Sequence, residues 1–454
     1  MRIRSVLLLL ALDAALISPL PSAAQTADRS AASVSSEASP QAPARTDDEP
    51  IRQTDRSPAP AKSSFSLSGM IAGSTLARLD TTIEPFFSLR AIPELNLALP
   101  AGHGLTFDAE ASANIYGSLL LAHDGPATTS GDIKPYRAWA RLSTSRFEVR
   151  LGLQKLSFGS ATLFRPLMWF DSLDPRDPLQ ITDGVYGLLL RCYAKGNANV
   201  WAWGLLGNKD RRGFDLAPPD NKTPEFGGRV EVPLFKGEIA ATYHHRKADI
   251  DGLTPIMSPA PALSLPASQI LPATRIVSSF AASLSASPIA VPPVPEDRFG
   301  LDGKWDIGPG VWFEGALVHQ QTPLLFTPYQ RALTLGLDYT FGLGKGLYAA
   351  AEHFRIASSA RAFSRPLSPQ AGLSFTALLL RYPLGLRDDI SGIFYYDWRN
   401  RDIYRFLSWK HTTDALTFSA IVYWNPPELL VFQGQPGSGS FAGTGLELLL
   451  AYYF

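Results

Sequence analysis

Apolar residues occupy every second position in many segments of the chain beyond residue 62. The clearest segment, 332–341, carries polar or small side chains between its apolar ones. Its apolar positions are Leu333, Leu335, Leu337, Tyr339 and Phe341. A period of two predicts a β-strand with one apolar face. No run of 18 or more apolar residues follows the N-terminal segment, so membrane-spanning helices are not expected there.

The same pattern, repeated between turn residues, predicts 18 strands. They are expected at 63–74, 82–98, 104–121, 135–144, 146–156, 183–194, 199–207, 225–234, 238–247, 298–307, 311–320, 332–341, 347–357, 372–382, 389–398, 403–411, 415–424 and 442–454. Segment 82–98 is the least regular, because Pro85 and Pro93 cannot donate to a sheet ladder. Sixteen strands is therefore the alternative. An even number returns both chain ends to one side of a closed antiparallel barrel.

The connections alternate between short and long. Tight turns such as 144–145 and 308–310 take turns with long links such as 157–182 and 248–297. Aromatic residues near strand ends, Trp203 among them, are expected to form interfacial girdles. A soluble sandwich shares the alternation of side chains, but short turns on one rim and long loops on the other are typical of outer-membrane barrels. The sequence predicts an all-β, transmembrane, antiparallel up-and-down β-barrel.

The C-terminal segment ends on an aromatic residue with apolar residues at every second position before it. Leu448, Leu450, Tyr452 and Phe454 share one face of the last predicted strand. This arrangement resembles the β-signal of outer-membrane barrels. The resemblance implies recognition by the barrel assembly machinery, with these four residues as the assembly signal.

The N-terminal region is expected to lie outside the barrel. Arg2 and Arg4 precede an apolar stretch at 6–20, and small residues follow, as in a cleavable signal peptide at 1–24. An uncleaved anchor is the alternative. Residues 25–62 are rich in Ala, Ser and Pro and predict a disordered periplasmic extension. The barrel would then span 63–454.

Charge and motif content narrow the function. The 41 basic and 41 acidic residues cancel, which argues against a nucleic-acid partner. The single Cys excludes an internal disulfide and a Cys-rich zinc site. We find no catalytic or nucleotide-binding motif, and the seven His are scattered. No enzyme activity, cofactor or metal is expected. The rival is a hydrolase with Ser and His on its outer wall, but parity does not place such a pair together.

The inward face of the predicted strands carries charges of both signs. The residues expected to line the pore or meet a solute are Arg137, Arg141, Arg146, Glu148, Arg150, Arg191, Arg381 and Arg405. They could form cross-strand ion pairs that hold the wall. Alternatively, arginines on adjacent strands could bind carboxylate or phosphate groups of a passing solute.

The link at 157–182 is too apolar to extend freely into water. It contains Leu163, Phe164, Met168 and Phe170, whose burial is favourable. We expect it to fold into the barrel as a constriction, with packing over the rim as the alternative. The residues expected at the constriction are Arg165, Trp169, Asp171, Asp174, Arg176 and Asp177.

One stretch resembles a known family. The sequence RLGLQKLSFG at 150–159, followed by the Asp- and Pro-rich link, is similar to the strand-and-loop signature of porin-like barrels related to the alginate-export family. That resemblance implies passive export or diffusion of an anionic polysaccharide through an arginine-lined pore.

The predicted function is that of a porin in the outer membrane of a Gram-negative bacterium. It would pass small polar or anionic solutes such as sugars, carboxylates and phosphate. The expected partners are these solutes, outer-membrane lipids and lipopolysaccharide, and the barrel assembly machinery; a homotrimer is left open. The alternative is a non-conducting barrel with a structural or adhesive role.

Overall fold

The structure is a computed structural model. It describes residues 63–79, 84–102, 104–121, 125–249, 292–322, 325, 327–364, 372–427 and 441–454. The predicted signal peptide at 1–24 and extension at 25–62 lie outside the described residues, as does most of the link at 248–297.

The described chain forms 18 strands, so the prediction of 18 is confirmed and the alternative of 16 is wrong. In chain order they are β1 (Ser64–Arg78), β2 (Glu84–Gly102), β3 (Leu105–Leu120), β4 (Thr128–Ser143), β5 (Phe147–Gln154), β6 (Val185–Tyr193), β7 (Asn199–Leu205), β8 (Glu225–Leu234), β9 (Gly237–Ala248), β10 (Val294–Asp306), β11 (Gly310–Gln320), β12 (Tyr329–Phe341), β13 (Leu347–Ser359), β14 (Gly372–Pro383), β15 (Asp388–Asp397), β16 (Ile403–Thr412), β17 (Leu416–Trp424) and β18 (Thr444–Tyr453).

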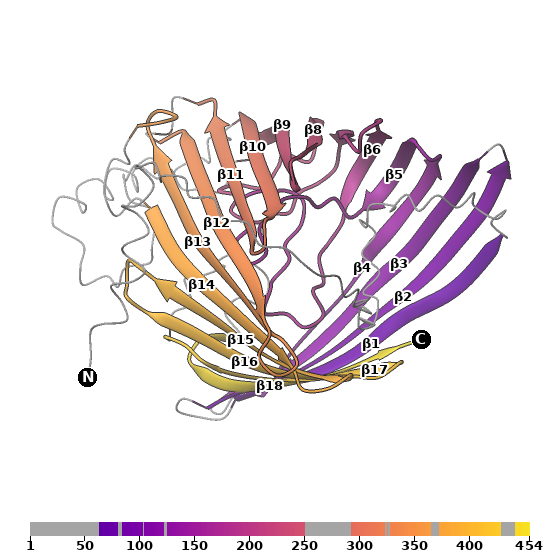
Figure 1. The fold of residues 1–454 in the computed structure, drawn as a ribbon. Coiled ribbons are helices and arrows are strands. Elements are labelled where there is room, and N and C mark those ends of the chain that lie inside the picture. The colour runs from indigo at the N-terminus through magenta and orange to yellow at the C-terminus, as the bar shows by residue number, and fades with distance from the viewer. Residues whose placement is uncertain are drawn as a thin grey trace, which may run out of the picture. The chain divides into compact units, whose positions relative to one another are not determined.

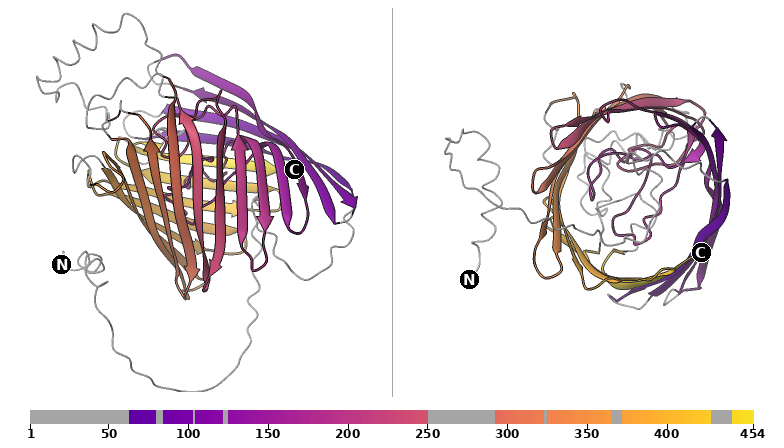
Figure 2. Two further views of the ribbon diagram at one scale, coloured as in Figure 1. Left: turned by 90° about the horizontal axis from the view of Figure 1, so that it is seen from above. Right: turned by 45° about the vertical axis from the view of Figure 1, so that its right-hand side comes forward.

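The strands close into one antiparallel barrel. Each strand pairs with its neighbours in the chain, and β1 pairs with β18 from Met70 opposite Tyr453 to Arg78 opposite Gly445. Figure 1 shows the strands side by side in chain order, and the right view of Figure 2 shows the closed ring. Closure leaves no unpaired sheet edge, as a spanning sheet in lipid requires.

Strand β2 forms despite its two prolines. Pro85 lies at its beginning, where a missing donor disturbs little. At Ile92 and Pro93 the pairing with β3 is interrupted. Opposite Ser112 and Ala113 of β3, strand β4 carries one extra residue, Tyr136, as a bulge. A further register shift lies between Pro100 and Gly102 at the end of β2. The pairing of β2 with β1 is unbroken, so the strand continues through Pro93.

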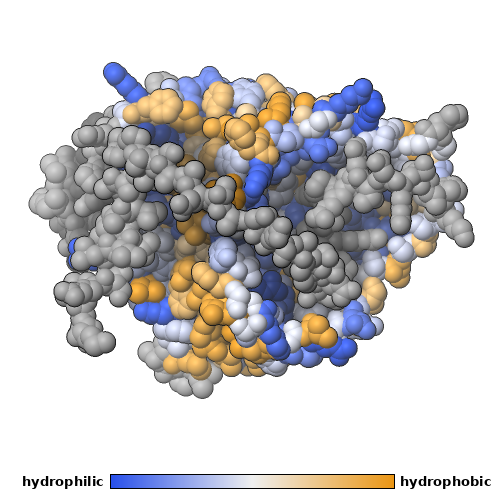
Figure 3. All heavy atoms as spheres, in the orientation of Figure 1, coloured by the Kyte–Doolittle hydropathy of each residue, from blue (hydrophilic) through white to orange (hydrophobic). Residues whose placement is uncertain are grey.

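The outer face of the wall is apolar. On β12, Leu333, Leu335 and Leu337 are exposed, while the intervening Thr334 is buried. Figure 3 shows hydrophobic residues along the lower margin of one face and hydrophilic residues set back in its hollow. A closed barrel with an outward apolar band is built to face lipid. Within the described ranges, no helix has the length and apolar character needed to cross a membrane.

The last strand presents its predicted face outward. Leu450, Tyr452 and Phe454 are exposed on the exterior, Leu448 is half-buried on the same face, and Ala451 is buried inside. The backbone N–H of Gly69 donates to the carbonyl of Phe454 at 2.9 Å, so the chain end is bound into the seam.

The interior is also apolar along part of the wall, which the sequence did not predict. The inward side chains on β13–β17 are Phe354, Phe375, Tyr395, Tyr404, Phe406 and Tyr423. Trp203 is likewise buried inside rather than placed in a lipid-facing girdle. Alternation fixes which residues share a face, but it does not say which face meets lipid.

A charge on the outer face should destabilise the barrel according to its depth. Leu335→Arg, near the middle of β12, should lower the free energy of unfolding in lipid vesicles by roughly 2–4 kcal/mol. The control, Leu343→Arg in the exposed turn after β12, should cost about 0–1 kcal/mol. Equal costs at the two sites would contradict a lipid-facing β12.

Candidate functional site in the barrel interior

The connection between β5 and β6, residues 155–184, lies inside the barrel; we call it the inward loop. In the right view of Figure 2 its purple trace runs within the ring of strands. Its apolar side chains are exposed by only 1–3%: Leu163, Phe164, Leu167, Met168 and Phe170. The loop therefore occupies the lumen rather than packing over the rim.

Two carboxylates on distant strands hold the backbone of the inward loop. Glu314 on β11 and Glu352 on β13 are both buried. Glu314 accepts the N–H groups of Ala161 at 2.9 Å and Leu167 at 2.6 Å. Glu352 accepts those of Thr162, Leu163 and Phe164 at 2.6–2.9 Å. These five bonds satisfy donors that the loop would otherwise bury without partners.

The approach of Glu314 requires a glycine in the loop. Gly159 has φ +108°, and a Cβ there would lie 2.3 Å from Oε2 of Glu314. Any side chain at this position would meet both a strained backbone and the carboxylate.

Aromatic rings of the loop pack on the apolar interior wall. Phe164 stacks on Phe354 with centroids 5.0 Å apart, and its edge meets Tyr395 at 5.4 Å. Trp169 lies 6.2 Å from the ring of His244. The packing of Phe164 against Phe354 and Tyr395 explains why β13–β17 carry aromatic residues on their inner face.

The six residues predicted at a constriction lie together in this loop, and five of them carry charge. Arg165 pairs with Asp171 at 3.0 Å. Arg176 pairs with Asp174 at 2.6 Å, and its guanidinium lies over the ring of Phe441. The sixth, Trp169, is buried. The charged groups of Arg165, Asp171, Asp174 and Arg176 are therefore paired with one another inside the loop.

Burial alters the ionisation of three loop groups. Burial alone would lower the pKa of Arg165, but the nearby carboxylates of Asp171 and Glu314 have the larger effect, so the pKa of Arg165 is raised. Burial raises the pKa of Asp177, although its carboxylate accepts the Leu179 N–H at 2.9 Å. Burial lowers the pKa of Arg212, which lies in the next long connection.

That second loop, residues 206–224 between β7 and β8, was missed by the sequence analysis as part of the interior. Arg212 donates to the carbonyls of Phe170, Asp183 and Gly184, which ties the two loops together. Phe214 stacks on Phe354 at 4.8 Å. In the sequence, Phe214 among polar residues was the main indication that this loop is buried.

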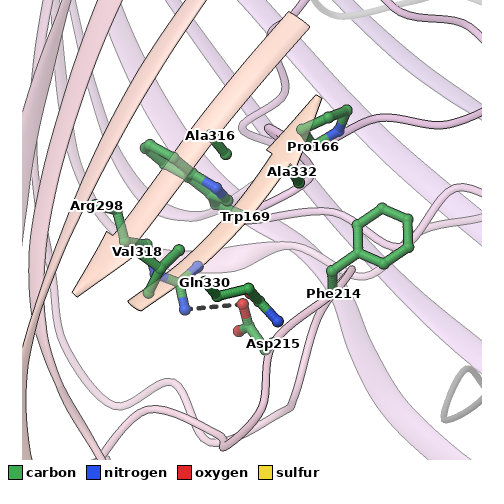
Figure 4. Close-up of a pocket in the computed structure, with 9 residues that line it drawn as sticks. All are labelled: Pro166, Trp169, Phe214, Asp215, Arg298, Ala316, Val318, Gln330 and Ala332. Carbon is green, nitrogen blue, oxygen red and sulfur yellow. Dashed lines mark ion pairs between the residues drawn. The ribbon is translucent and has the colours of Figure 1, made fainter. Parts of the chain in front are cut away.

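The two loops and the wall enclose a small cavity of about 10 Å³. Figure 4 shows Trp169 and Phe214 at its border, with Asp215 paired to Arg298 at 2.8 Å. This volume holds about one water molecule, so it is a packing gap and not a solute site.

Two predicted pore arginines, Arg150 and Arg191, are buried around one carboxylate, and the partly exposed Arg141 approaches it from β4. Glu148 lies 3.1 Å from Arg150 and 4.0 Å from both Arg141 and Arg191. Arg191 covers the ring of Trp201 at 3.9 Å. Their guanidinium groups hold the wall by ion pairing and stacking.

Arg137 is buried as well, and it reaches toward the inward loop. Its guanidinium lies over the ring of Tyr136 at 4.0 Å. It also donates to the carbonyl of Thr182 at 3.0 Å. Arg137 therefore links β4 to the end of the loop.

Arg141 and Arg381 are more accessible. The Arg141 side chain is 27% exposed and pairs with Asp108 at 3.1 Å. Arg381 is 44% exposed and pairs with Asp389 at 3.2 Å near the short-turn rim. Arg141 is thus the accessible guanidinium on the wall formed by β3–β5.

Two predicted lumen positions are corrected by the structure. Arg146 is exposed in the turn between β4 and β5, because β5 begins at Phe147. Arg405 faces outward, because its neighbours Tyr404 and Phe406 are buried inside against loop aromatics. Its guanidinium donates to the carbonyl of Trp424 at 3.4 Å.

The part of the chain that the structure describes contains no group of three or more His, Cys, Asp or Glu side chains placed to hold a metal ion. His244 and His245 face opposite sides of β9. His244 is buried beside Glu225 at 3.2 Å, and His245 contacts Asp297 at 2.8 Å on the outer face.

Replacing Glu352 should loosen the inward loop, because a Gln side chain has one acceptor oxygen for four N–H donors, including that of Trp312. In Glu352→Gln, amide hydrogen exchange at 162–164 should accelerate about 30-fold, corresponding to a loss of about 2 kcal/mol. Asp338→Asn is the control, since its carboxylate accepts from Tyr348 and not from the loop. Unchanged exchange in Glu352→Gln would show that the carboxylate does not hold the loop.

Comparisons with known proteins find similarity in fold alone. No family model matches the sequence, so the alginate-export resemblance has no support there. No curated protein matches. The barrel is similar to Pseudomonas aeruginosa OccK5, with a TM-score of 0.49 and 12% identity over 86% of this chain and 97% of that chain. It is similar to Acinetobacter baumannii OccAB1, with a TM-score of 0.47 and 10% identity over 86% of this chain and 96% of that chain. It is also similar to an anion-selective porin from Comamonas acidovorans, with a TM-score of 0.40 and 12% identity over 87% of this chain and 100% of that chain. In fold, the chain resembles outer-membrane porins.

Proposed function

We propose that the chain is a passive channel in the outer membrane of a Gram-negative bacterium, for small polar or anionic solutes. The observation that carries this proposal is the uneven filling of the interior. The inward residues Glu314 on β11 and Glu352 on β13 are fully covered. On β2–β4 some inward residues, such as Ile92 and Arg137, are also buried, but Arg90, Asp108 and Arg141 keep partial exposure. A solute path would run between the inward loop and this wall.

We define the polar wall as the partly exposed inward side of β1–β4. Its residues include Ser68, Ser88, Arg90, Asn96, Asp108, Ser112 and Arg141. Hydroxyl and amide groups suit sugars, and a guanidinium suits carboxylate or phosphate. These side chains together favour small hydrophilic solutes over apolar ones.

Selectivity at the polar wall would come from a local pair and not from bulk charge. Arg141 donates from Nε and Nη2 to Oδ2 of Asp108, at 3.2 and 3.1 Å. Opposite charges side by side produce a field across the path. The Arg141 side chain is 27% exposed and that of Asp108 is 18% exposed, which favours a mild preference for anions.

The inward loop would set the width of the path. Its charged residues Arg165, Asp171, Asp174 and Arg176 form ion pairs within the loop, so its role is chiefly steric.

The outward face of β18 supports a further proposal, that the barrel assembly machinery recognises Leu450, Tyr452 and Phe454.

A non-conducting barrel is the second candidate, favoured by the burial of so much of the interior. Purified full-length protein in a planar lipid bilayer separates the two. A channel gives stable ion current steps, and swelling of liposomes in sugar solutions would then rank solutes. Absence of current from folded protein would overturn the channel.

Changing the charge of the polar wall should change ion selectivity. Arg141→Gln should lower the anion-to-cation permeability ratio by about a factor of four, because one charge at about 10 Å in water changes anion and cation permeability by about two each, in opposite directions. Asp108→Asn should raise the ratio by a similar factor. Arg405→Gln, which removes an outward-facing charge, should leave it unchanged. A ratio insensitive to both Arg141 and Asp108 would place the conducting path elsewhere.

A further inference from the structure

A polar cluster lies on the lipid-facing side of β13 and β14, where the sequence analysis expected no paired Ser and His. His353 and Ser374 both point outward, since Phe354 and Phe375 beside them are buried inside. The distance between Nε2 of His353 and Oγ of Ser374 is 3.5 Å. Ser374 is a diagonal neighbour of His353 across the strands, so parity within one strand could not reveal the pair.

The ring of His353 is oriented by a second hydroxyl. Its Nδ1 lies 2.9 Å from Oγ1 of Thr376, directly opposite in the register. Thr376 also accepts a hydrogen bond from Nε1 of Trp398 at 2.8 Å. When Nδ1 carries the proton and donates to Thr376, the Nε2 lone pair is available to Ser374. Nucleophile, base and orienting group then stand in the order that hydroxyl activation requires.

The cluster lies near the rim formed by the longer loops. Strand β13 ends at Ser359 and β14 begins at Gly372, a few residues away. Tyr396 and Trp398 lie beside the cluster, with ring centroids 4.9 Å apart. Aromatic rings of this kind sit at headgroup depth, and the ester groups of membrane lipids lie at the same depth.

A cationic side chain stands next to the hydroxyl. Arg355 is directly opposite Ser374 in the register, on the same outer face, and is exposed. A guanidinium there can stabilise negative charge that develops on an ester oxygen, or hold a lipid phosphate.

We infer that Ser374 and His353 form a second site, which hydrolyses acyl esters of membrane lipids at the outer rim of the barrel. The site lies on the opposite side of the wall from the solute path and does not depend on conduction.

The chemistry balances without a cofactor. The Ser374 oxygen attacks the ester carbonyl as its proton passes to Nε2 of His353, and Arg355 faces the oxyanion. The bond from carbonyl carbon to the alkoxy oxygen breaks, and the alcohol leaves with the proton from His353. A water molecule then gives a proton to Nε2 of His353 and attacks the acyl-serine. The bond from carbonyl carbon to the Ser374 oxygen breaks, His353 returns the proton to that oxygen, and the fatty acid leaves.

The test uses the purified full-length barrel and two readouts. One is covalent labelling of Ser374 by a fluorophosphonate, located by mass spectrometry. The other is fatty acid release from vesicles of phosphatidylethanolamine. Ser374→Ala should abolish labelling, and His353→Gln should slow labelling and lipid hydrolysis at least about 100-fold. Ser145→Ala, in an exposed turn, is the control.

The heat-dependent change in electrophoretic mobility of the folded barrel in detergent serves as the check on folding of each variant, and it should equal that of the unmodified chain. Thr376→Val should slow labelling and alter its pH profile, while Thr376→Ser should restore both, as expected of a positioning residue. Unlabelled Ser374 in folded barrel, or lipid hydrolysis that persists in Ser374→Ala, would overturn the inference. Either result leaves the proposed channel untouched.

Discussion

The interior of this barrel is organised by two buried carboxylates that accept five backbone N–H groups of the inward loop. Glu314 and Glu352 fix the loop against β11 and β13. Because the loop is held on that side, its aromatic rings need an apolar surface, which the inner face of β13–β17 supplies. On the inner face of β1–β4, polar residues such as Arg90, Asp108 and Arg141 stay partly exposed beside buried ones such as Leu76 and Ile92.

Because the interior is filled unevenly, some charged pairs are buried and hold the wall, while another pair stays in contact with solvent. Arg150 and Arg191 are buried around Glu148, and removing one partner would leave an uncompensated charge. Arg141 and Asp108 keep contact with solvent and can act on a solute. The chain has zero net charge, and its charges divide into buried pairs that hold the wall and pairs such as Arg141 and Asp108 that stay in contact with solvent.

The strands could be predicted because each alternates with a period of two, and the loop could be predicted because Phe164 and Trp169 need burial. The orientation of Arg405 could not, since parity does not show which face meets lipid, and loop packing makes the inner face of β16 aromatic. The roles of Glu314 and Glu352 were also hidden. Their partners are backbone amides about 150–190 residues away in sequence, and such groups leave no residue pattern.

The proposed solute path runs along the polar wall on β1–β4, and the inward loop fills the lumen elsewhere. Thiol modification during bilayer recording tests it directly, in a Cys192→Ser background because Cys192 is exposed. With Ser112→Cys, on the polar wall, a charged thiol reagent should reduce the current. With Ala316→Cys, buried on β11, it should have no effect. Reduction at position 316 and none at 112 would contradict the account.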